Sequence, residues 1–249
     1  ALPISPEERM ANIVRFMDRM GVERVYVMNE IADEFERLVR EQVKALRYGP
    51  GDDVDLGAIF WDKQLDIIKH HVEDARKRGA TIDVGGEIDR ALGVFYKPTL
   101  LTNVTHEMEI MREETFGPIV AIMRVSSEAE AIRLANDSEY GLSASVWTKD
   151  IEKGIRIAKQ IEAGSVCIND ATLAYGVPEA PFGGLKKSGL GSVNGLGALR
   201  SYSHELPIVI DRWGLDKEDH WYPFTDKTLR NLEYTLKYVF GTKLRRFFS

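Results

Sequence analysis

The sequence predicts an α/β fold in which a mainly parallel sheet is flanked by helices. Two observations carry this prediction. Strand-like and helix-like segments alternate regularly between residues 119 and 168, and such alternation is typical of parallel strands connected by helices. Apolar residues make up 44% and charged residues 29% of the 249 residues, which is the composition of a globular protein with a buried core.

The first predicted elements are a helix, a strand and a second helix. The first helix covers residues 6–19, where Ser5 and Glu8 have the spacing of a capping box. Residues 24–28 are rich in the β-branched and aromatic side chains that favour a strand. Asn29 is suited to cap the second helix. The apolar stripe of that helix comprises Ile31, Phe35, Leu38, Val39, Val43 and Leu46.

A loop, a third helix and two extended runs follow. Residues 49–53 combine glycine, proline and aspartate, which is strong turn chemistry. The third helix runs from about residue 63 to 78, and Gly79 is placed to end it. We expect the runs 81–84 and 96–101 to be extended.

The second half begins with a predicted strand at residues 119–125. Ser127 and Glu130 form a capping-box pattern at the start of the next helix, which ends near Asn136. A strand at 143–147 then leads to a helix, for which Asp150 is the expected cap.

The alternation ends with a strand at 165–168, after a glycine at position 164 that closes the preceding helix. Residues 205–210 read as an isolated late strand. A polar stretch at 211–220 separates it from a last predicted helix near residues 225–240.

Charge and composition exclude several classes of function. A net charge of −6 provides no strong basic field with which to displace counterions from a nucleic acid. No apolar run is long enough to span a bilayer, and residues 1–9 do not have the charged and apolar regions of a signal peptide. A single cysteine, Cys167, cannot form an internal disulfide, so we expect a reducing, cytoplasmic location.

Two motifs carry the chemistry of this chain. They are EETFGP at 113–118 and PFGGLKKSG at 181–189. Further segments stand in order around them: ERVYV, ADEFERLV, YKPTLL and AGSVCIND. From Arg24 to about Ile210 this order resembles the C-terminal, catalytic half of the aldehyde dehydrogenase superfamily.

The resemblance implies an activity and a cofactor. Members of the family oxidise an aldehyde to a carboxylic acid with NAD or NADP. A cysteine thiolate attacks the aldehyde, hydride passes to the cofactor, and water activated by a glutamate hydrolyses the thioester. The resemblance makes Glu114 the residue that binds the nicotinamide ribose hydroxyls and Phe116 the ring beside the nicotinamide. By the same resemblance, Asn169 and Phe182 bind the substrate.

The resemblance does not supply a nucleophile. The family places the cysteine of Gly-Gln-x-Cys at the position of Arg19, and an arginine is permanently protonated. The Glu-Leu-Gly-Gly motif of the general base and the cofactor domain are also missing from these residues. Cys167 reads as a small packed side chain of a framework strand rather than as a nucleophile. We therefore assign no catalytic residue.

Other chemistry is not indicated. The five histidines show no metal-ligand spacing, and no cysteine pair supports them, so we predict no metal site. The glycines at 189, 191 and 195 follow a loop rather than a strand, which favours turn chemistry over a dinucleotide-binding motif.

The expected organisation has three parts. An N-terminal helix covers residues 1–21, a catalytic domain resembling that of aldehyde dehydrogenases covers 22–202, and an oligomerisation strand with a C-terminal helical tail covers 203–249. We expect a family protein that is incomplete and inactive alone. Two alternatives stay open, namely half of a split dehydrogenase completed by a partner chain, and a structural or regulatory subunit.

The expected partners follow from the same plan. They are a second copy of the chain or a complementary chain, with a small aldehyde as substrate of an active enzyme. The tail, 225–249, carries a net charge of +4. A helix that docks on the protein is the favoured interpretation of this tail, and contact with an anionic membrane is the alternative.

Overall fold

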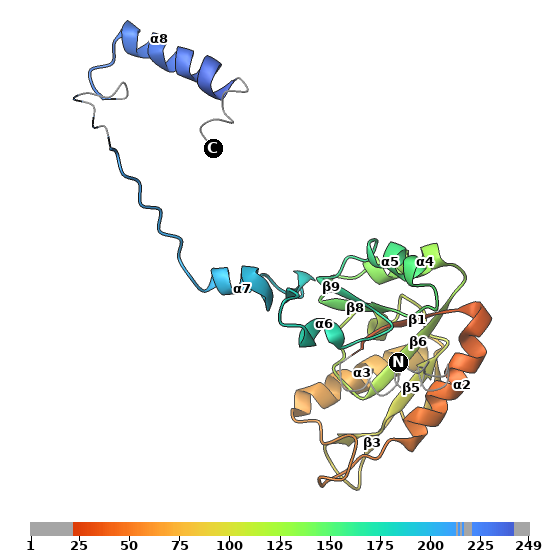
Figure 1. Cartoon of the computed structure of the whole chain (residues 1–249). Coiled ribbons are helices and arrows are strands. Elements are labelled where there is room, and N and C mark those ends of the chain that lie inside the picture. The colour runs from red at the N-terminus through yellow and green to blue at the C-terminus, as the bar shows by residue number, and fades with distance from the viewer. Residues whose placement is uncertain (1–21, 213, 215, 217–220, 242–249) are drawn as a thin grey trace. The chain divides into compact units, whose positions relative to one another are not determined.

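The computed structural model describes residues 22–212, 214, 216 and 221–241. It divides into two units, one that ends at Ser203 and one that begins at His204 (Figure 1). We describe each unit by itself. The helix predicted at residues 6–19 lies outside the described residues.

The centre of the first unit is a sheet with the strand order β1-β6-β5-β2. Its strands are β1 (Val25–Met28), β6 (Ile119–Val125), β5 (Thr99–Thr102) and β2 (Thr81–Val84). Strands β1 and β5 both run parallel to β6, whereas β2 is antiparallel to β5. The mainly parallel sheet predicted from the sequence is therefore confirmed.

Two helices cover the two faces of this sheet, α2 (Asn29–Ala45) and α3 (Asp62–Lys77). Successive strand residues point to opposite faces. Leu100 of β5 therefore packs with α2, and its neighbour Leu101 packs with α3. The same alternation divides Ile122 and Ala121 of β6 between the two cores.

Helix α2 differs from its prediction at its start. The helix includes Asn29, its N-cap is Met28, and no side chain caps it, so the prediction of Asn29 as a cap was wrong. Ile31 is exposed, whereas Ala32 and Glu36 take inward positions. The pattern of apolar residues could not predict that Glu36 is buried, because a charged residue is buried only when a distant partner pairs with it.

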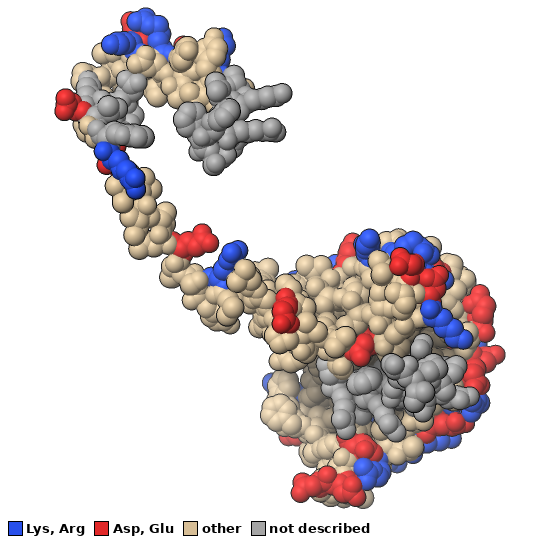
Figure 2. Space-filling model, in the orientation of Figure 1, with Lys and Arg blue, Asp and Glu red and all other residues tan. Residues whose placement is uncertain are grey.

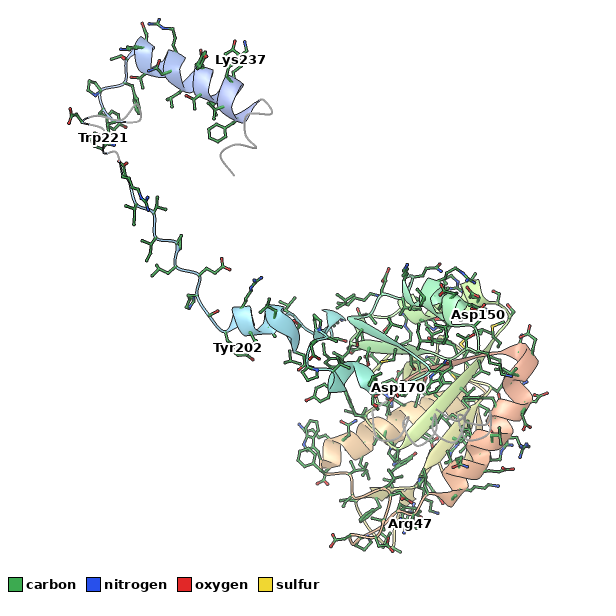
Figure 3. All side chains as sticks on the ribbon, in the orientation of Figure 1. Arg47, Asp150, Asp170, Tyr202, Trp221 and Lys237 are labelled. Carbon is green, nitrogen blue, oxygen red and sulfur yellow. The ribbon has the colours of Figure 1, made fainter. Side chains whose placement is uncertain are left out.

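A second layer contains the parallel strands β8 (Ser143–Val146) and β9 (Ser165–Ile168), connected by α5 (Ile151–Ala158). Asp150 caps α5 as predicted, because its Oδ1 accepts a hydrogen bond from the Lys153 amide at 2.9 Å (Figure 3). Helix α4 (Glu128–Asn136) follows β6, and Ser127 caps it through the Glu130 amide.

Short elements complete this unit. They are β3 (Ile88–Asp89), β4 (Phe95–Tyr96), η1 (Glu109–Met111), β7 (Tyr140–Gly141), α6 (Leu173–Gly176), β10 (Phe182–Gly183), β11 (Leu185–Lys186), β12 (Ser192–Val193) and α7 (Gly195–Ser201). Antiparallel pairs form between β3 and β4, β7 and β11, and β10 and β12.

Backbone segments approach closely around the second sequence motif. A Cβ atom on Gly164, just before β9, would lie 1.7 Å from the carbonyl oxygen of Gly183. A Cβ atom on Gly183 would lie 2.3 Å from the carbonyl oxygen of Gly191. Only glycine fits such contacts, so these positions fix how the motif lies against the β8–β9 layer.

In the second unit, α8 (Asp226–Tyr234) continues into the π-helical turns of η2 (Thr235–Phe240). This agrees with the helix predicted near 225–240, and Thr225 caps it in a capping box with Thr228. The strand predicted at 205–210 does not form, because these residues pair with no strand of the described part of the chain. An extended segment becomes a strand only when a neighbour supplies the hydrogen bonds.

Among the described residues, no helix has the length and apolar content needed to cross a membrane.

An ion pair between a buried carboxylate and an exposed guanidinium joins α2 to the sheet. The Glu36 carboxylate, 8% exposed, accepts hydrogen bonds from Nε and Nη2 of Arg124 on β6 at 2.8 and 2.6 Å. The guanidinium also contacts Asp33 at 2.7 Å, but that carboxylate is 90% exposed. Loss of the Arg124 guanidinium is therefore much more unfavourable for the buried carboxylate of Glu36 than for the exposed carboxylate of Asp33.

We predict that Arg124→Met lowers the free energy of unfolding by about 3 kcal/mol, because it leaves Glu36 as a buried carboxylate without its partner. Asp33→Asn is the matched control and should cost less than about 1 kcal/mol, as for a solvent-exposed pair. Urea unfolding of the two variants measures this difference. Equal losses in both would contradict the importance of burial.

A second buried polar contact joins α3 to the chain before β6. His71 is 6% exposed, and its Nδ1 lies 3.0 Å from Oγ1 of Thr115. Burial lowers the pKa of His71 below its usual 6.5, because the protonated ring loses its hydration. The folded state therefore favours the neutral ring.

This pKa sets a pH dependence of stability. Above the unfolded pKa of about 6.5 the contribution is fully present, and it is lost as pH falls through the lower folded pKa. We predict that His71→Gln, which cannot titrate, loses less stability than the wild type between pH 7 and pH 5. Unfolding in urea at both pH values measures this. The exposed His204→Gln should keep the wild-type response, and an unchanged response in His71→Gln would contradict the assignment.

Candidate functional site

The first motif forms a loop between η1 and β6. Glu114 is half-buried, and its carboxylate makes no hydrogen bond or ion pair with any described residue. Phe116 is 59% exposed and has a φ of +43°, a backbone conformation that L residues rarely adopt. The two residues predicted to hold the cofactor therefore lie in one loop, with side-chain groups not engaged by the rest of the described chain.

Glu23 fixes the backbone of this loop from the start of β1. Its carboxylate accepts hydrogen bonds from the amides of Thr115 at 2.9 Å and Phe116 at 3.0 Å. Burial raises the pKa of Glu23, and the two amide donors oppose that rise. Sequence reasoning missed this residue, because nothing in a lone acidic position before a strand indicates which distant amides it meets.

Helix α3 holds the other side of the same loop. Gln64 Nε2 donates a hydrogen bond to the Thr115 carbonyl at 2.5 Å, and His71 contacts the Thr115 hydroxyl. A Cβ atom on Gly117 would lie 2.7 Å from Ile68, so the loop packs directly on the helix. The loop is therefore held on two sides, while Glu114 and Phe116 keep their side-chain groups available.

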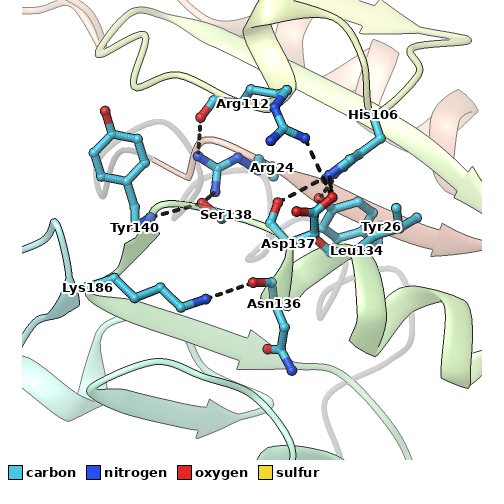
Figure 4. A network of polar contacts seen from close by, with 10 residues as sticks. All are labelled: Arg24, Tyr26, His106, Arg112, Leu134, Asn136, Asp137, Ser138, Tyr140 and Lys186. Atoms are coloured by element: carbon cyan, nitrogen blue, oxygen red, sulfur yellow. Dashed lines mark hydrogen bonds and ion pairs between the residues drawn. The ribbon is translucent and has the colours of Figure 1, made fainter.

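Arg24 connects the loop to the second motif (Figure 4). Its guanidinium donates to Ser138 Oγ at 2.7 Å and to the Arg112 carbonyl at 3.3 Å. It also lies 5.9 Å from the ring centroid of Tyr140, a distance at which cation–π attraction acts. The Tyr140 hydroxyl in turn donates to Glu113 at 3.4 Å.

The second motif reaches the same residues through the pairing of β7 with β11. Tyr140 pairs with Lys186 in this two-stranded sheet. The Lys186 ammonium donates to the Asn136 carbonyl at 2.7 Å and forms an ion pair with Glu162. Thus Tyr140 contacts both motifs, one through its hydroxyl and one through its backbone.

A buried histidine supports the same region (Figure 4). His106 Nε2 lies 3.1 Å from the Asp137 carbonyl and 3.0 Å from its carboxylate, so Nε2 carries the hydrogen. Its Nδ1 lies 3.4 Å from the hydroxyl of Tyr26, which donates to the Leu134 carbonyl. Hydrogen bonding to His106 lowers the pKa of Asp137, and burial raises the pKa of Tyr26 to about 12. The network fixes the end of α4 against the sheet.

The predicted substrate residues lie after β9. Asn169 has a φ of +58°, and its side chain accepts from the Thr148 amide and donates to the Thr148 carbonyl. Both of its polar groups are therefore used to shape the loop. Phe182 is half-buried and packs edge-on against Tyr175 of α6, with ring centroids 5.3 Å apart. Within the described residues no hydrogen bond, ion pair or ring contact joins Asn169 or Phe182 to Glu114 or Phe116, so their role in one site stays a prediction.

Cys167 lies on β9 opposite Ser145 and is half-buried, as expected for a framework strand. Arg19, at the position where the family has its cysteine, lies outside the described residues. Where the structure describes the chain, no three His, Cys, Asp or Glu side chains gather as a metal site would require.

Comparison with known proteins finds a family match. The model of the aldehyde dehydrogenase family matches residues 19–205. A protein of Mycolicibacterium smegmatis described as a succinate-semialdehyde dehydrogenase (NADP(+)) is 43% identical over 197 residues, which are 78% of this chain and 38% of that protein. The 4,4'-diapolycopene aldehyde oxidase of a Methylomonas species is 38% identical over 89% of this chain and 41% of its own length.

Solved structures agree with these relatives. Betaine aldehyde dehydrogenase from Staphylococcus aureus, in complex with NAD+, superposes with a TM-score of 0.72 at 35% identity, over 80% of this chain and 42% of that one. Lactaldehyde dehydrogenase from Escherichia coli gives a TM-score of 0.72 at 31% identity, over 79% and 42%.

The chain thus spans about two fifths of the length of the relatives it matches. The family model covers most of it, and the fold, the two motifs and the loop that Glu23 holds all lie in the matched residues. The chain belongs to the aldehyde dehydrogenase family.

Proposed function

We propose that this chain supplies the C-terminal catalytic portion of an NAD- or NADP-dependent aldehyde dehydrogenase. One observation carries the proposal. The loop at 113–118 is held by Glu23 and α3, yet in the described chain the Glu114 carboxylate makes no hydrogen bond or ion pair and the Phe116 ring is 59% exposed. Rigid backbone with uncommitted functional groups is what a binding site requires.

The residues present fit the nicotinamide end of the cofactor. A carboxylate without a protein partner is able to accept hydrogen bonds from both ribose hydroxyls, which we assign to Glu114. The exposed ring of Phe116 would lie beside the nicotinamide. When bound, the cofactor supplies the hydride acceptor. One relative is named for NADP(+) and one solved structure holds NAD+, and both remain candidates.

We assign the aldehyde end of the site to the segment after β9. Phe182, braced by Tyr175, would form a wall of the substrate site. Asn169 would act by positioning the loop of residues 170–180, since its amide is held by Thr148. The named substrates of the relatives differ widely, so the proposal extends to the class of aldehydes only.

The chain alone is proposed to be inactive. Its 249 residues contain neither Gly-Gln-x-Cys nor Glu-Leu-Gly-Gly, and Arg19 stands where the nucleophile is expected. The thiolate, the general base and the cofactor domain would have to come from outside these 249 residues. The single cysteine supports a reducing, cytoplasmic location for such an assembly.

A structural or regulatory subunit is the second candidate function. The observation that favours it is the segment 205–210, which has no strand partner among the described residues and exposes Leu206 by 80% and Val209 by 92%. Unpaired apolar edges invite pairing with another chain. A stable dimer without any complementable activity would favour this candidate over the dehydrogenase half.

We predict that the chain alone forms no NADH from any aldehyde and that Cys167→Ala does not change that result. Mixed with a chain that carries the two missing motifs and a cofactor domain, it should form NADH in a spectrophotometric assay. Activity of the chain alone that is lost in Cys167→Ala would contradict our reading of this cysteine.

In the complemented enzyme, Glu114→Gln should raise the KM for the cofactor by about tenfold. A charge-assisted hydrogen bond contributes about 1.5–3 kcal/mol, and tenfold corresponds to about 1.4 kcal/mol. The exposed Glu107→Gln is the control with the same charge change and should leave the KM unchanged. Equal KM values for both variants would show that Glu114 does not bind the cofactor.

Unfolding measurements distinguish a residue that supports the loop from one that binds the cofactor. Glu23→Gln should lower the free energy of unfolding by about 1–3 kcal/mol, because the side-chain amide accepts from only one of the two backbone amides, those of Thr115 and Phe116, that the carboxylate holds. Glu114→Gln should cost almost nothing, because Glu114 has no partner among the described residues. Urea unfolding measures both variants. If Glu114→Gln proved as destabilising as Glu23→Gln, Glu114 would be a structural residue.

A further inference from the structure

The C-terminal helix has two unlike faces. Leu229, Leu232, Leu236 and Phe240 recur at spacings of three and four residues, which places them on one side of α8 and η2. All four side chains are exposed. This side has the spacing of an apolar stripe that ordinarily faces a core, but no described residue of its unit buries it.

The other side of the helix carries the charged residues. Lys227, Arg230 and Lys237 lie there, and Asp226 and Glu233 stand four residues before Arg230 and Lys237 respectively. Figure 2 shows basic side chains along one side of α8 with acidic ones beside them. Three further basic residues, Lys243, Arg245 and Arg246, follow in the sequence. Residues 225–249 hold six basic and two acidic residues, whereas the rest of the chain holds 27 and 37. The net charge is therefore +4 for the tail and −10 for the remainder.

Aromatic side chains flank the helix. Trp221, Tyr222 and Phe224 precede it and are exposed. Tyr234 and Tyr238 lie along it with ring centroids 4.5 Å apart, and the Lys237 ammonium lies 5.4 Å from the Tyr238 ring. Tryptophan and tyrosine prefer the boundary between hydrocarbon and water, because each has an apolar body and a polar tip.

We propose that the segment 221–241 binds the surface of an anionic phospholipid bilayer, with the helix lying in the plane of the interface. An apolar stripe opposite a charged face, flanked by aromatic residues and followed in the sequence by three further basic residues, has the design of an interfacial helix. The positive tail is attracted to anionic headgroups, whereas the acidic remainder of the chain is repelled by them. The tail would thus hold the chain at a membrane surface, where apolar aldehydes concentrate.

The test is sedimentation of the full chain with vesicles of phosphatidylcholine, with and without phosphatidylserine. The chain should sediment with the anionic vesicles only, and added salt should weaken this binding because it screens the headgroups. Lys227→Glu combined with Arg230→Glu should lower the partition coefficient at least tenfold, since each basic residue near an anionic surface contributes about fivefold.

Two further variants decide between lipid and protein as the partner. Leu229→Ser combined with Leu236→Ser should also abolish vesicle binding, because it removes the apolar stripe but no charge. Lys149→Glu combined with Lys159→Glu makes the same charge change at exposed positions of the first unit and should bind like the wild type. Sedimentation velocity without lipid should show one oligomeric state for all variants.

Three results would overturn the proposal. One is no binding to anionic vesicles, and another is equal loss of binding in the tail and first-unit lysine variants. The third is a tail variant that dissociates a lipid-free oligomer while vesicle binding stays unchanged, which would make the tail a protein-docking helix.

Discussion

The adjacent residues Glu23 and Arg24 are the constraint on which the arrangement of the candidate site depends. They sit at the entrance of β1, and their side chains serve different parts of the fold. Glu23 accepts two amide hydrogen bonds from the loop at 113–118. Arg24 holds Ser138, the Arg112 carbonyl and the ring of Tyr140. Because β1 pairs in parallel with β6, both sets of contacts are anchored to the central sheet.

The sheet is rigid because each of its faces is closed by a helix. Alternate residues of β5 and β6 enter two separate cores, one with α2 and one with α3. The α3 core reaches the functional loop directly, since Ile68 packs at Gly117 and His71 meets Thr115. A loop supported by both a strand and a helix has little freedom, which suits a site that must meet a ligand in one geometry. This support places the Glu23 carboxylate and the His71 ring largely out of water, which costs free energy of hydration.

The two units of the chain differ in how far they bury their own apolar side chains. The first has its own cores and a polar network around His106. The second exposes the apolar residues of 206–210 and of α8, so its surface is suited to other molecules. Within this unit, residues 225–249 carry a net charge of +4, against −10 for the rest of the chain, so charge as well as apolar area selects what binds there.

The sequence by itself determined the fold class, most strand and helix limits, and the family. Periodicity and capping residues act locally, so Asp150, Ser127 and the strand at 119–125 were predictable. The motif residues Glu114, Phe116, Asn169 and Phe182 could be named, but not their surroundings. Only the tertiary structure decided that Asn29 does not cap α2, that Glu36 is buried and that 205–210 has no partner strand among the described residues. It also showed that Asn169 is held by Thr148 and that Glu23 holds the loop. The contacts of Asn169 and Glu23 join residues 21 to 93 positions apart, and no local pattern of side chains encodes such contacts.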